Sequence, residues 1–128
     1  MQIDPIIAVK DVPKASQWYQ QVFGYTSQHG GNDFDVLLSE EGEIRLCLHR
    51  WGEHDHPSMK DPGITPGNGL ILYFRTNKLE TIRQNLKNLD YPVAREIQLN
   101  PNSGMQEFSV VDPNGYYLTV SEFHRFGG

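Results

Sequence analysis

The residue types best suited to chemistry gather near the middle of the chain. Cys47 and His49 lie two residues apart in an apolar run, and His54 and His56 follow shortly after it. A cysteine beside a histidine is a candidate thiolate nucleophile, and neighbouring histidines can hold a metal ion. Residues two apart on a strand, however, have side chains about 7 Å apart, which is too far for direct proton transfer. We therefore expect Cys47 to fill space and the later histidines to lie in a polar linker, while a metal site in this stretch stays an alternative.

The elements that position these residues repeat along the chain. Short apolar or β-branched runs predict strands, and apolar residues at three- and four-residue steps predict helices. The first half is predicted to contain a strand, a helix and three strands, at residues 6–9, 13–23, 25–29, 34–38 and 44–49. The second half is predicted to repeat that order, at residues 70–75, 79–89, 91–97, 105–111 and 116–122. This internal repeat predicts an α+β fold made of two βαβββ modules.

Local signals mark the ends of the first predicted helix and one turn. Asp11 suits the N-cap of the helix, Pro13 suits its first turn, and Gly24 suits the left-handed residue that ends it. The segment 112–115, Asp-Pro-Asn-Gly, has the residue types of a hairpin turn.

Residues 51–69 separate the two halves of the chain. Proline, glycine and charged residues occur there without periodicity, which is typical of a linker. We predict a single domain over residues 1–128, with module one at about 4–50 and module two at about 70–123. Each module has an apolar helix face to bury, so two modules placed edge to edge would form a curved, incompletely closed mixed sheet around a cleft.

Composition excludes several classes of protein. Hydrophobic residues make up 38% and charged residues 21%, as in globular proteins, and no apolar run is long enough to cross a membrane. The net charge of −5 and the scattered basic residues predict no binding to nucleic acid. The start of the chain lacks the features of a signal peptide, so we expect a soluble cytoplasmic protein. Its single cysteine cannot form an internal disulfide.

Both ends of the chain resemble one known superfamily. Residues 7–15, Ile-Ala-Val-Lys-Asp-Val-Pro-Lys-Ala, followed by Trp18-Tyr19 and 22–25, are similar to the opening motif of the vicinal-oxygen-chelate proteins. Residues 104–116, which end in Asp-Pro-Asn-Gly-Tyr, are similar to their closing hairpin. The superfamily includes glyoxalase I, extradiol dioxygenases, fosfomycin-resistance enzymes and bleomycin-resistance proteins. The closing segment and the His-Pro-Ser stretch of the linker resemble the bleomycin-resistance branch most.

The resemblance implies four metal-ligand positions, one on the first and one on the last strand of each module, where the enzymes carry His, Glu or Gln. They fall at Asp4, at Arg45 or its neighbour Leu46, at Ile71 and at Thr119. Asp4 can donate a carboxylate oxygen, whereas Arg45 would repel a cation. Leu46 and Ile71 offer no donor, and Thr119 stands where the enzymes carry Glu. We therefore predict no metal, no cofactor and no catalytic residue.

Strand alternation predicts which side chains face the cleft. Residues two apart on a strand share one face of the sheet, so the neighbours of the four positions share theirs. The opposite face is uniformly apolar, as a helix-covered face must be, and consists of Ile7, Val9, Ile44, Leu46, Leu48, Leu72, Phe74, Leu118 and Val120. The predicted ligand-binding residues are Asp4, Ile6, Arg45, Cys47, His49, Ile71, Tyr73, Arg75, Tyr117, Thr119 and Ser121, with Trp51 at the edge of the cleft.

These side chains leave the charge of the ligand open. Tyr73, Tyr117 and Trp51 offer stacking surfaces for a planar or cationic molecule. Arg45 and Arg75 suit a carboxylate or phosphate. The structural alternative is that the arginines pair with a carboxylate of the chain, namely Asp4, Asp35 or Glu122.

The sequence predicts a metal-independent protein that binds a small organic molecule in the cleft. The resemblance to the bleomycin-resistance branch implies a homodimer whose two chains build the ligand grooves between them. A second hypothesis is a metal-dependent lyase, isomerase or dioxygenase with an atypical metal site. A third is an interaction module whose cleft is filled by its own side chains.

Overall fold

The computed structural model describes residues 2–52, 57–59, 61–65 and 67–123. The chain forms two compact units, Met1–Pro66 and Gly67–Gly128, which contain module one and module two. Each unit has the predicted βαβββ order, so the prediction of an α+β fold is confirmed. The boundary between the units lies inside the predicted linker, and the single domain with its cleft stays a prediction.

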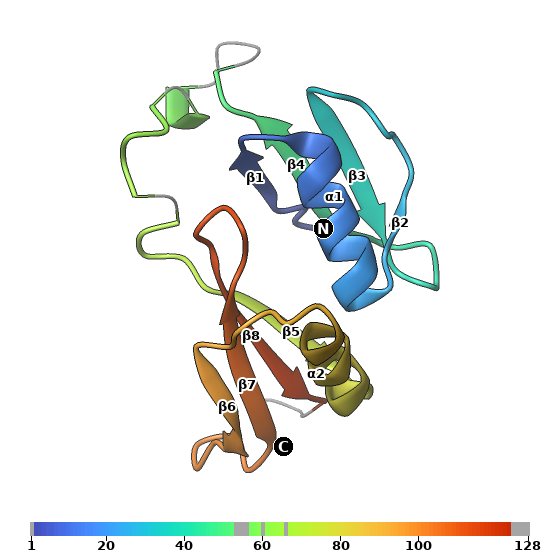
Figure 1. Ribbon diagram of the computed structural model, residues 1–128, viewed down its shortest axis with the longest axis vertical. Coiled ribbons are helices and arrows are strands. Elements are labelled where there is room, and N and C mark those ends of the chain that lie inside the picture. The colour runs from blue at the N-terminus through green and yellow to red at the C-terminus, as the bar shows by residue number, and fades with distance from the viewer. Residues whose placement is uncertain (1, 53–56, 60, 66, 124–128) are drawn as a thin grey trace. The chain divides into compact units, whose positions relative to one another are not determined.

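Module one is a four-stranded mixed sheet with a helix on one face (Figure 1). Its elements are β1 (Ile6–Val9), α1 (Val12–Phe23), β2 (Thr26–Ser27), β3 (Phe34–Leu38) and β4 (Ile44–Arg50). The strand order is β1-β4-β3-β2, in which β1 is parallel to β4 and the other pairs are antiparallel. A short 3-10 helix, Pro57–Met59, follows in the linker.

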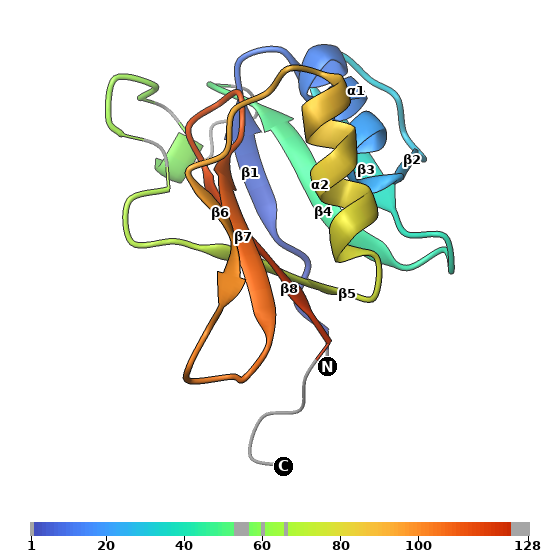
Figure 2. The ribbon, with the colours of Figure 1, turned by 60° about the horizontal axis from the view of Figure 1, so that its bottom comes forward.

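Module two repeats this arrangement: its helix contacts β8, and Figure 2 shows β6, β7 and β8 side by side. Its elements are β5 (Leu72–Thr76), α2 (Leu79–Asn88), β6 (Arg95–Leu99), β7 (Gln106–Val111) and β8 (Tyr117–Glu122). The strand order is β5-β8-β7-β6, and again the first strand is parallel to the last while the other pairs are antiparallel.

Helix α1 begins and ends within one residue of its predicted bounds. The Asp11 carboxylate accepts a hydrogen bond from the backbone N–H of Lys14 at 3.0 Å, a cap worth about 1 kcal/mol. Gly24 has a φ of 73° and donates its N–H to the carbonyl of Gln20 at 3.0 Å. The apolar stripe of the helix is buried, namely Ala15, Trp18, Tyr19 and Val22.

The strand predicted over 25–29 is reduced to Thr26–Ser27. The backbone N–H groups of His29 and Gly30 instead donate hydrogen bonds to Oδ1 of Asp35, at 3.2 and 2.8 Å. Asp35 is only 1% exposed, and its burial would raise its pKa. Hydrogen bonds from backbone N–H groups and serine hydroxyls outweigh this effect and lower the pKa of Asp35 below its usual value.

The strand predicted over 91–97 begins only at Arg95, because the chain first turns out of helix α2. Asp90 has a φ of 52°, and the N–H of Tyr91 donates to the carbonyl of Leu86 at 2.9 Å. This is the pattern of a helix that ends at one left-handed residue. The turn delays the return of the chain to the sheet.

Apolar side chains fill the space between each helix and its sheet. The central residues of β4 and β8 on the helix side are at most 1% exposed, namely Leu46, Leu48, Leu118 and Val120. Helix α2 contributes Leu79, Ile82 and Leu86. Leu89, the last residue of the predicted helix, is 40% exposed because it lies beyond the last helical residue. Burying one such large side chain contributes about 1.5–3 kcal/mol.

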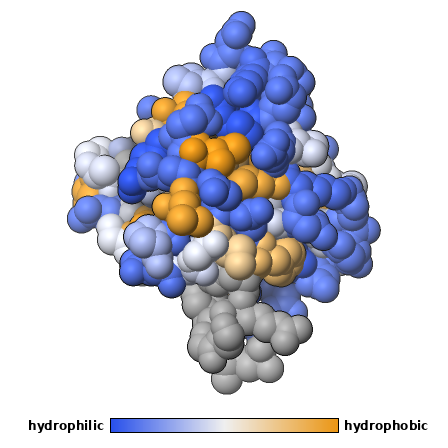
Figure 3. All heavy atoms as spheres, turned by 90° about the horizontal axis from the view of Figure 1, so that it is seen from below, coloured by the Kyte–Doolittle hydropathy of each residue, from blue (hydrophilic) through white to orange (hydrophobic). Residues whose placement is uncertain are grey.

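The outer surface is mixed in polarity. On the side that Figure 3 displays, hydrophobic atoms reach the surface in small groups between hydrophilic atoms. Within the described ranges, neither helix has the length and hydropathy needed to cross a membrane.

Candidate functional site

In module one, the sheet face opposite α1 holds predicted ligand-binding residues in adjacent rows. Ile6 lies beside Cys47, and Ala8 lies beside His49. Ile6 is 48% exposed, whereas Cys47 and His49 are 5% and 4% exposed. The middle of this face is therefore packed, and Ile6 provides apolar surface at its edge.

The Cys47 thiol is not poised as a nucleophile. Burial raises its pKa, and the negative charges of Asp4 and Asp35 raise it further. A thiol reacts as its thiolate, so a raised pKa lowers its reactivity at neutral pH.

His49 is fixed by its backbone and by a neighbouring ring. Its Nδ1 lies 2.7 Å from the carbonyl oxygen of Arg50, which can only accept, so Nδ1 carries the proton. Phe34, its neighbour on β3, meets the imidazole edge-on with 6.2 Å between ring centroids. The ring orientation of His49 is thereby set within the sheet face.

Arg45 has a partner that the sequence does not predict. Its guanidinium lies 2.9 Å from the Glu43 carboxylate on the same hairpin, with both side chains exposed. Asp4, one of the expected partners, is exposed and accepts a hydrogen bond from Gln2 at 2.8 Å. Arg45 therefore pairs with a carboxylate of the chain, which is the structural alternative, but its partner is Glu43 and not one of the expected carboxylates.

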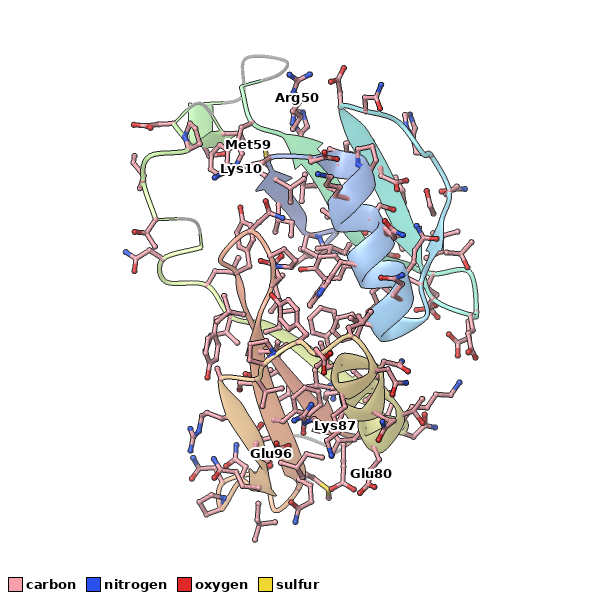
Figure 4. The ribbon with its side chains drawn as sticks, viewed as in Figure 1. Lys10, Arg50, Met59, Glu80, Lys87 and Glu96 are labelled. Carbon is pink, nitrogen blue, oxygen red and sulfur yellow. The ribbon has the colours of Figure 1, made fainter. Side chains whose placement is uncertain are left out.

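Trp51 lies at the carboxyl end of the β1–β4 pair. Its backbone N–H donates to the carbonyl of Val9 at 3.3 Å, which extends the pairing of the two strands by one residue. Lys10, Arg50 and Met59 lie at this same end of module one (Figure 4). His54 and His56, the candidate metal stretch, lie outside the described residues.

In module two, the face opposite α2 carries three rows of side chains. In the first row Val111 lies beside Tyr117, and Ile71 directly precedes β5. The second row joins Tyr73 to Thr119 and Ser109, and the third joins Arg75 to Ser121 and Glu107. Moving from the first row to the third, the side chains change from apolar to hydroxylated to charged.

The exposed members of these rows lie at the edges of the face. Ile71, Tyr73 and Val111 are 59%, 41% and 40% exposed, while Thr119 and Ser121 in the centre are buried. The hydroxyls of Thr119 and Ser109 lie 3.0 Å apart and share a hydrogen bond. The guanidinium carbon of Arg75 lies 5.9 Å from the ring centroid of Phe123.

Glu107 is a candidate site residue that was not among those predicted from the sequence. Tyr73 donates its hydroxyl to Oε2 of Glu107 at 3.2 Å, and the Asn100 amide donates to Oε1 at 2.7 Å. The signal that could have found it is the alternation in β7, where Phe108 and Val110 are buried on the helix side. Glu107 must then point to the opposite face, with the predicted residues.

The four family metal-ligand positions do not form a donor set for a divalent cation. The Thr119 hydroxyl is bonded to Ser109, Arg45 brings a positive charge, and Ile71 has no donor. Of these four positions, only Asp4 carries a carboxylate. Within the part of the chain that the structure describes, no group of three or more His, Cys, Asp or Glu side chains is placed to hold a metal ion.

The comparisons with known proteins identify the family. The model of the Glyoxalase/Bleomycin resistance protein/Dioxygenase superfamily matches residues 2–120. The chain belongs to this superfamily. The predicted membership of this superfamily is thereby confirmed. No curated protein was found to be similar to the chain.

Solved structures from several bacteria share the fold. A possible glyoxalase from Bacillus cereus is 25% identical, with 94% of this chain and 98% of that chain covered and a TM-score of 0.63. TioX from Micromonospora sp. ML1 is 16% identical, with 95% and 98% covered and a TM-score of 0.74. A lactoylglutathione lyase from Agrobacterium tumefaciens is 17% identical, with 95% and 92% covered and a TM-score of 0.71. Identities this low relate folds and leave activity open.

Proposed function

We propose that this protein binds a small organic molecule, without a metal ion, on the sheet faces that α1 and α2 leave uncovered. The face of module two carries the proposal, because ordered hydroxyl and carboxylate groups lie there beside exposed apolar side chains. Sites for small organic molecules combine these two features, since apolar surface supplies affinity and a few placed polar groups fix orientation. The predicted ligand-binding residues form the proposed site, with Glu107 added.

The chemistry of the family ligand positions supports binding without metal. A metal-dependent relative polarises its substrate through a divalent ion held by several oxygen and nitrogen donors. Here a cation at Arg45 and an alkyl group at Ile71 replace two of those donors. Asp4 by itself supplies too few donor atoms to hold such an ion.

A ligand screen with and without metal tests this function. NMR spectra of isotope-labelled protein are recorded with mixtures of small organic molecules, in EDTA and after adding Ni²⁺, Mn²⁺, Zn²⁺ or Fe²⁺. We expect signals of Tyr73 and Thr119 to shift with a ligand, equally in EDTA and in metal. Ligand binding that requires metal, or stoichiometric metal binding that is lost in Asp4→Ala, contradicts the proposal.

We also propose that the protein is a homodimer, as similarity to the bleomycin-resistance branch implies. Light scattering during size-exclusion chromatography measures the mass directly. A monomeric mass at every concentration tested would rule the dimer out.

A further inference from the structure

We propose that the sheet face of module two opposite α2 selects an amphipathic cation, with the ammonium or amidinium group at Glu107 and the apolar part over Ile71 and Val111. This inference rests on the proposed function, because it names the ligand class for the same face.

The partners of Glu107 are the first reason. Both are neutral donors, the hydroxyl of Tyr73 and the amide of Asn100, and each contacts a different carboxylate oxygen. Among the described residues, no ion pair within 4.0 Å compensates the charge of Glu107. A carboxylate has about four lone-pair sites, so two neutral contacts leave room for further donors. The Glu107 charge is held in place and still available to a cation.

The position of Glu107 in the face is the second reason. It is partly buried and shares its row with the buried Ser121. Water screens a partly buried charge less than a fully exposed one, and a charged hydrogen bond there is stronger than a neutral one. An ammonium group that donates to Glu107 would therefore gain more than it would from a carboxylate on a mobile surface side chain.

The apolar row is the third reason. Val111 lies beside Tyr117 and is 40% exposed, and Ile71, directly before β5, is 59% exposed, so the row offers apolar surface together with an aromatic ring. Glu107 and Val111 are separated by four residues along β7, which at the rise of a strand is roughly 13 Å. A ligand that uses both ends must carry its cation and its apolar group at about this separation.

Arg75, in the third row, makes binding of an anion the alternative outcome. Arg75 lies across Ser121 from Glu107, with its guanidinium near the Phe123 ring. If Arg75 rather than Glu107 meets the ligand, the face would prefer an anion. The sign of the preferred charge therefore separates the two possibilities.

Two fluorescent probes with the same apolar part test the inference. Dansylcadaverine ends in an ammonium group, and the dansyl derivative of aminohexanoic acid ends in a carboxylate. Each probe is titrated with the purified full-length protein, in whichever oligomeric state it has, and the fluorescence anisotropy of the probe is measured. We expect the cation to bind about tenfold tighter, the size of one charged hydrogen bond.

A pair of matched variants assigns the preference to one residue. Glu107→Gln should abolish the preference for the cation, although its amide can still bond to Tyr73 and Asn100. Glu80→Gln removes the same charge from α2, on the other side of the sheet, and should keep the preference (Figure 4). The thermal unfolding of both variants shows that they are folded.

The outcomes distinguish this inference from the proposed function. Equal affinities, a preference for the anion, or a preference unchanged in Glu107→Gln overturn the inference, while probe binding itself still supports a binding face. Failure of both probes to bind also overturns it. If the ligand mixtures then leave the signals of Tyr73 and Thr119 unshifted as well, the proposed function fails with it.

Discussion

The hydroxyl of Tyr73 lies 3.2 Å from Oε2 of Glu107, although the strands that carry these two residues are separated by β8. The Tyr73 side chain must therefore extend over β8, where Thr119 and Ser121 are buried. The contact fixes a carboxylate on the sheet face opposite α2 without using an opposite charge. If the proposed site is used, the role of Tyr73 is to orient Glu107 toward the ligand.

Replacing Tyr73 with Phe tests that role. The ring and its apolar surface remain, but the hydrogen bond that orients Glu107 is lost. We expect the preference for dansylcadaverine over the acidic probe to fall several-fold, while the free energy of unfolding changes by no more than about 1 kcal/mol. Anisotropy titration and urea unfolding measure the two effects. The same change at Tyr25, in module one, should leave the preference intact, and an unaltered preference in Tyr73→Phe would show that the contact is only structural.

Module two contains an ion pair with two hydrogen bonds on its helix side. Arg83 meets Glu96 with two hydrogen bonds, from Nε at 2.7 Å and from Nη2 at 2.8 Å. Figure 4 labels Glu96 on β6 and Lys87 on α2. The pKa of Glu96 is lowered from 4.5 to about 2, and the hydrogen bonding from Arg83 is the main cause.

The lowered pKa gives this pair a defined pH window. A carboxylate with a depressed pKa in the folded state contributes stability above its unfolded pKa and loses it as the pH falls through the folded pKa. The stability difference between the wild type and Glu96→Gln should therefore shrink between about pH 4.5 and about pH 2. Urea unfolding across this range measures it. In Arg83→Gln the NMR titration of Glu96 should move back toward its ordinary pKa, and an unmoved titration would assign the shift to another group.

Helix α2 ends on an unfavourable residue. Asp90 adopts a φ of 52°, and its N–H donates to the carbonyl of Lys87 at 3.0 Å. A left-handed backbone favours glycine, and a negative charge repels the carboxyl end of a helix. Asp90→Gly should raise the free energy of unfolding by about 0.5–1 kcal/mol, with a smaller gain for Asp90→Asn. Thermal or urea unfolding measures the gain, and a loss of stability in Asp90→Gly would contradict this account of the turn.

Cys47 should resist alkylation in the native protein. It is 5% exposed, and burial raises its pKa, so both access and thiolate population are low. Mass spectrometry after treatment with iodoacetamide should show slow labelling in buffer and rapid labelling in urea. Equal rates in the two conditions would mean that Cys47 is accessible and reactive in the folded state.

The parts of the fold that depend on local signals could be predicted from the sequence. Asp11 and Gly24 mark both ends of α1 because a cap and a left-handed glycine act within a few residues. The end of α2 lacked such a signal, since Asp90 occupies the position that glycine normally marks. The start of β6 was therefore misplaced.

The candidate site was harder to predict because it depends on register between distant strands. Periodicity identifies which residues of β5 share a face, but it does not show that Tyr73 reaches Glu107 across β8. Arg45 gives the converse case, since its partner Glu43 is adjacent on the hairpin and the expected carboxylates are not used. Pairing of exposed charges is set by side-chain reach, which sequence spacing describes poorly.

In each module the first strand pairs with the last, β1 with β4 and β5 with β8. Ile6 can meet Cys47 only after the whole chain between them is in place, so this pairing closes a long loop and forms slowly. On the ribosome, α1 can form while the rest of module one is still being synthesised. The sheet of module one, however, cannot be completed until the chain has been translated as far as Arg50.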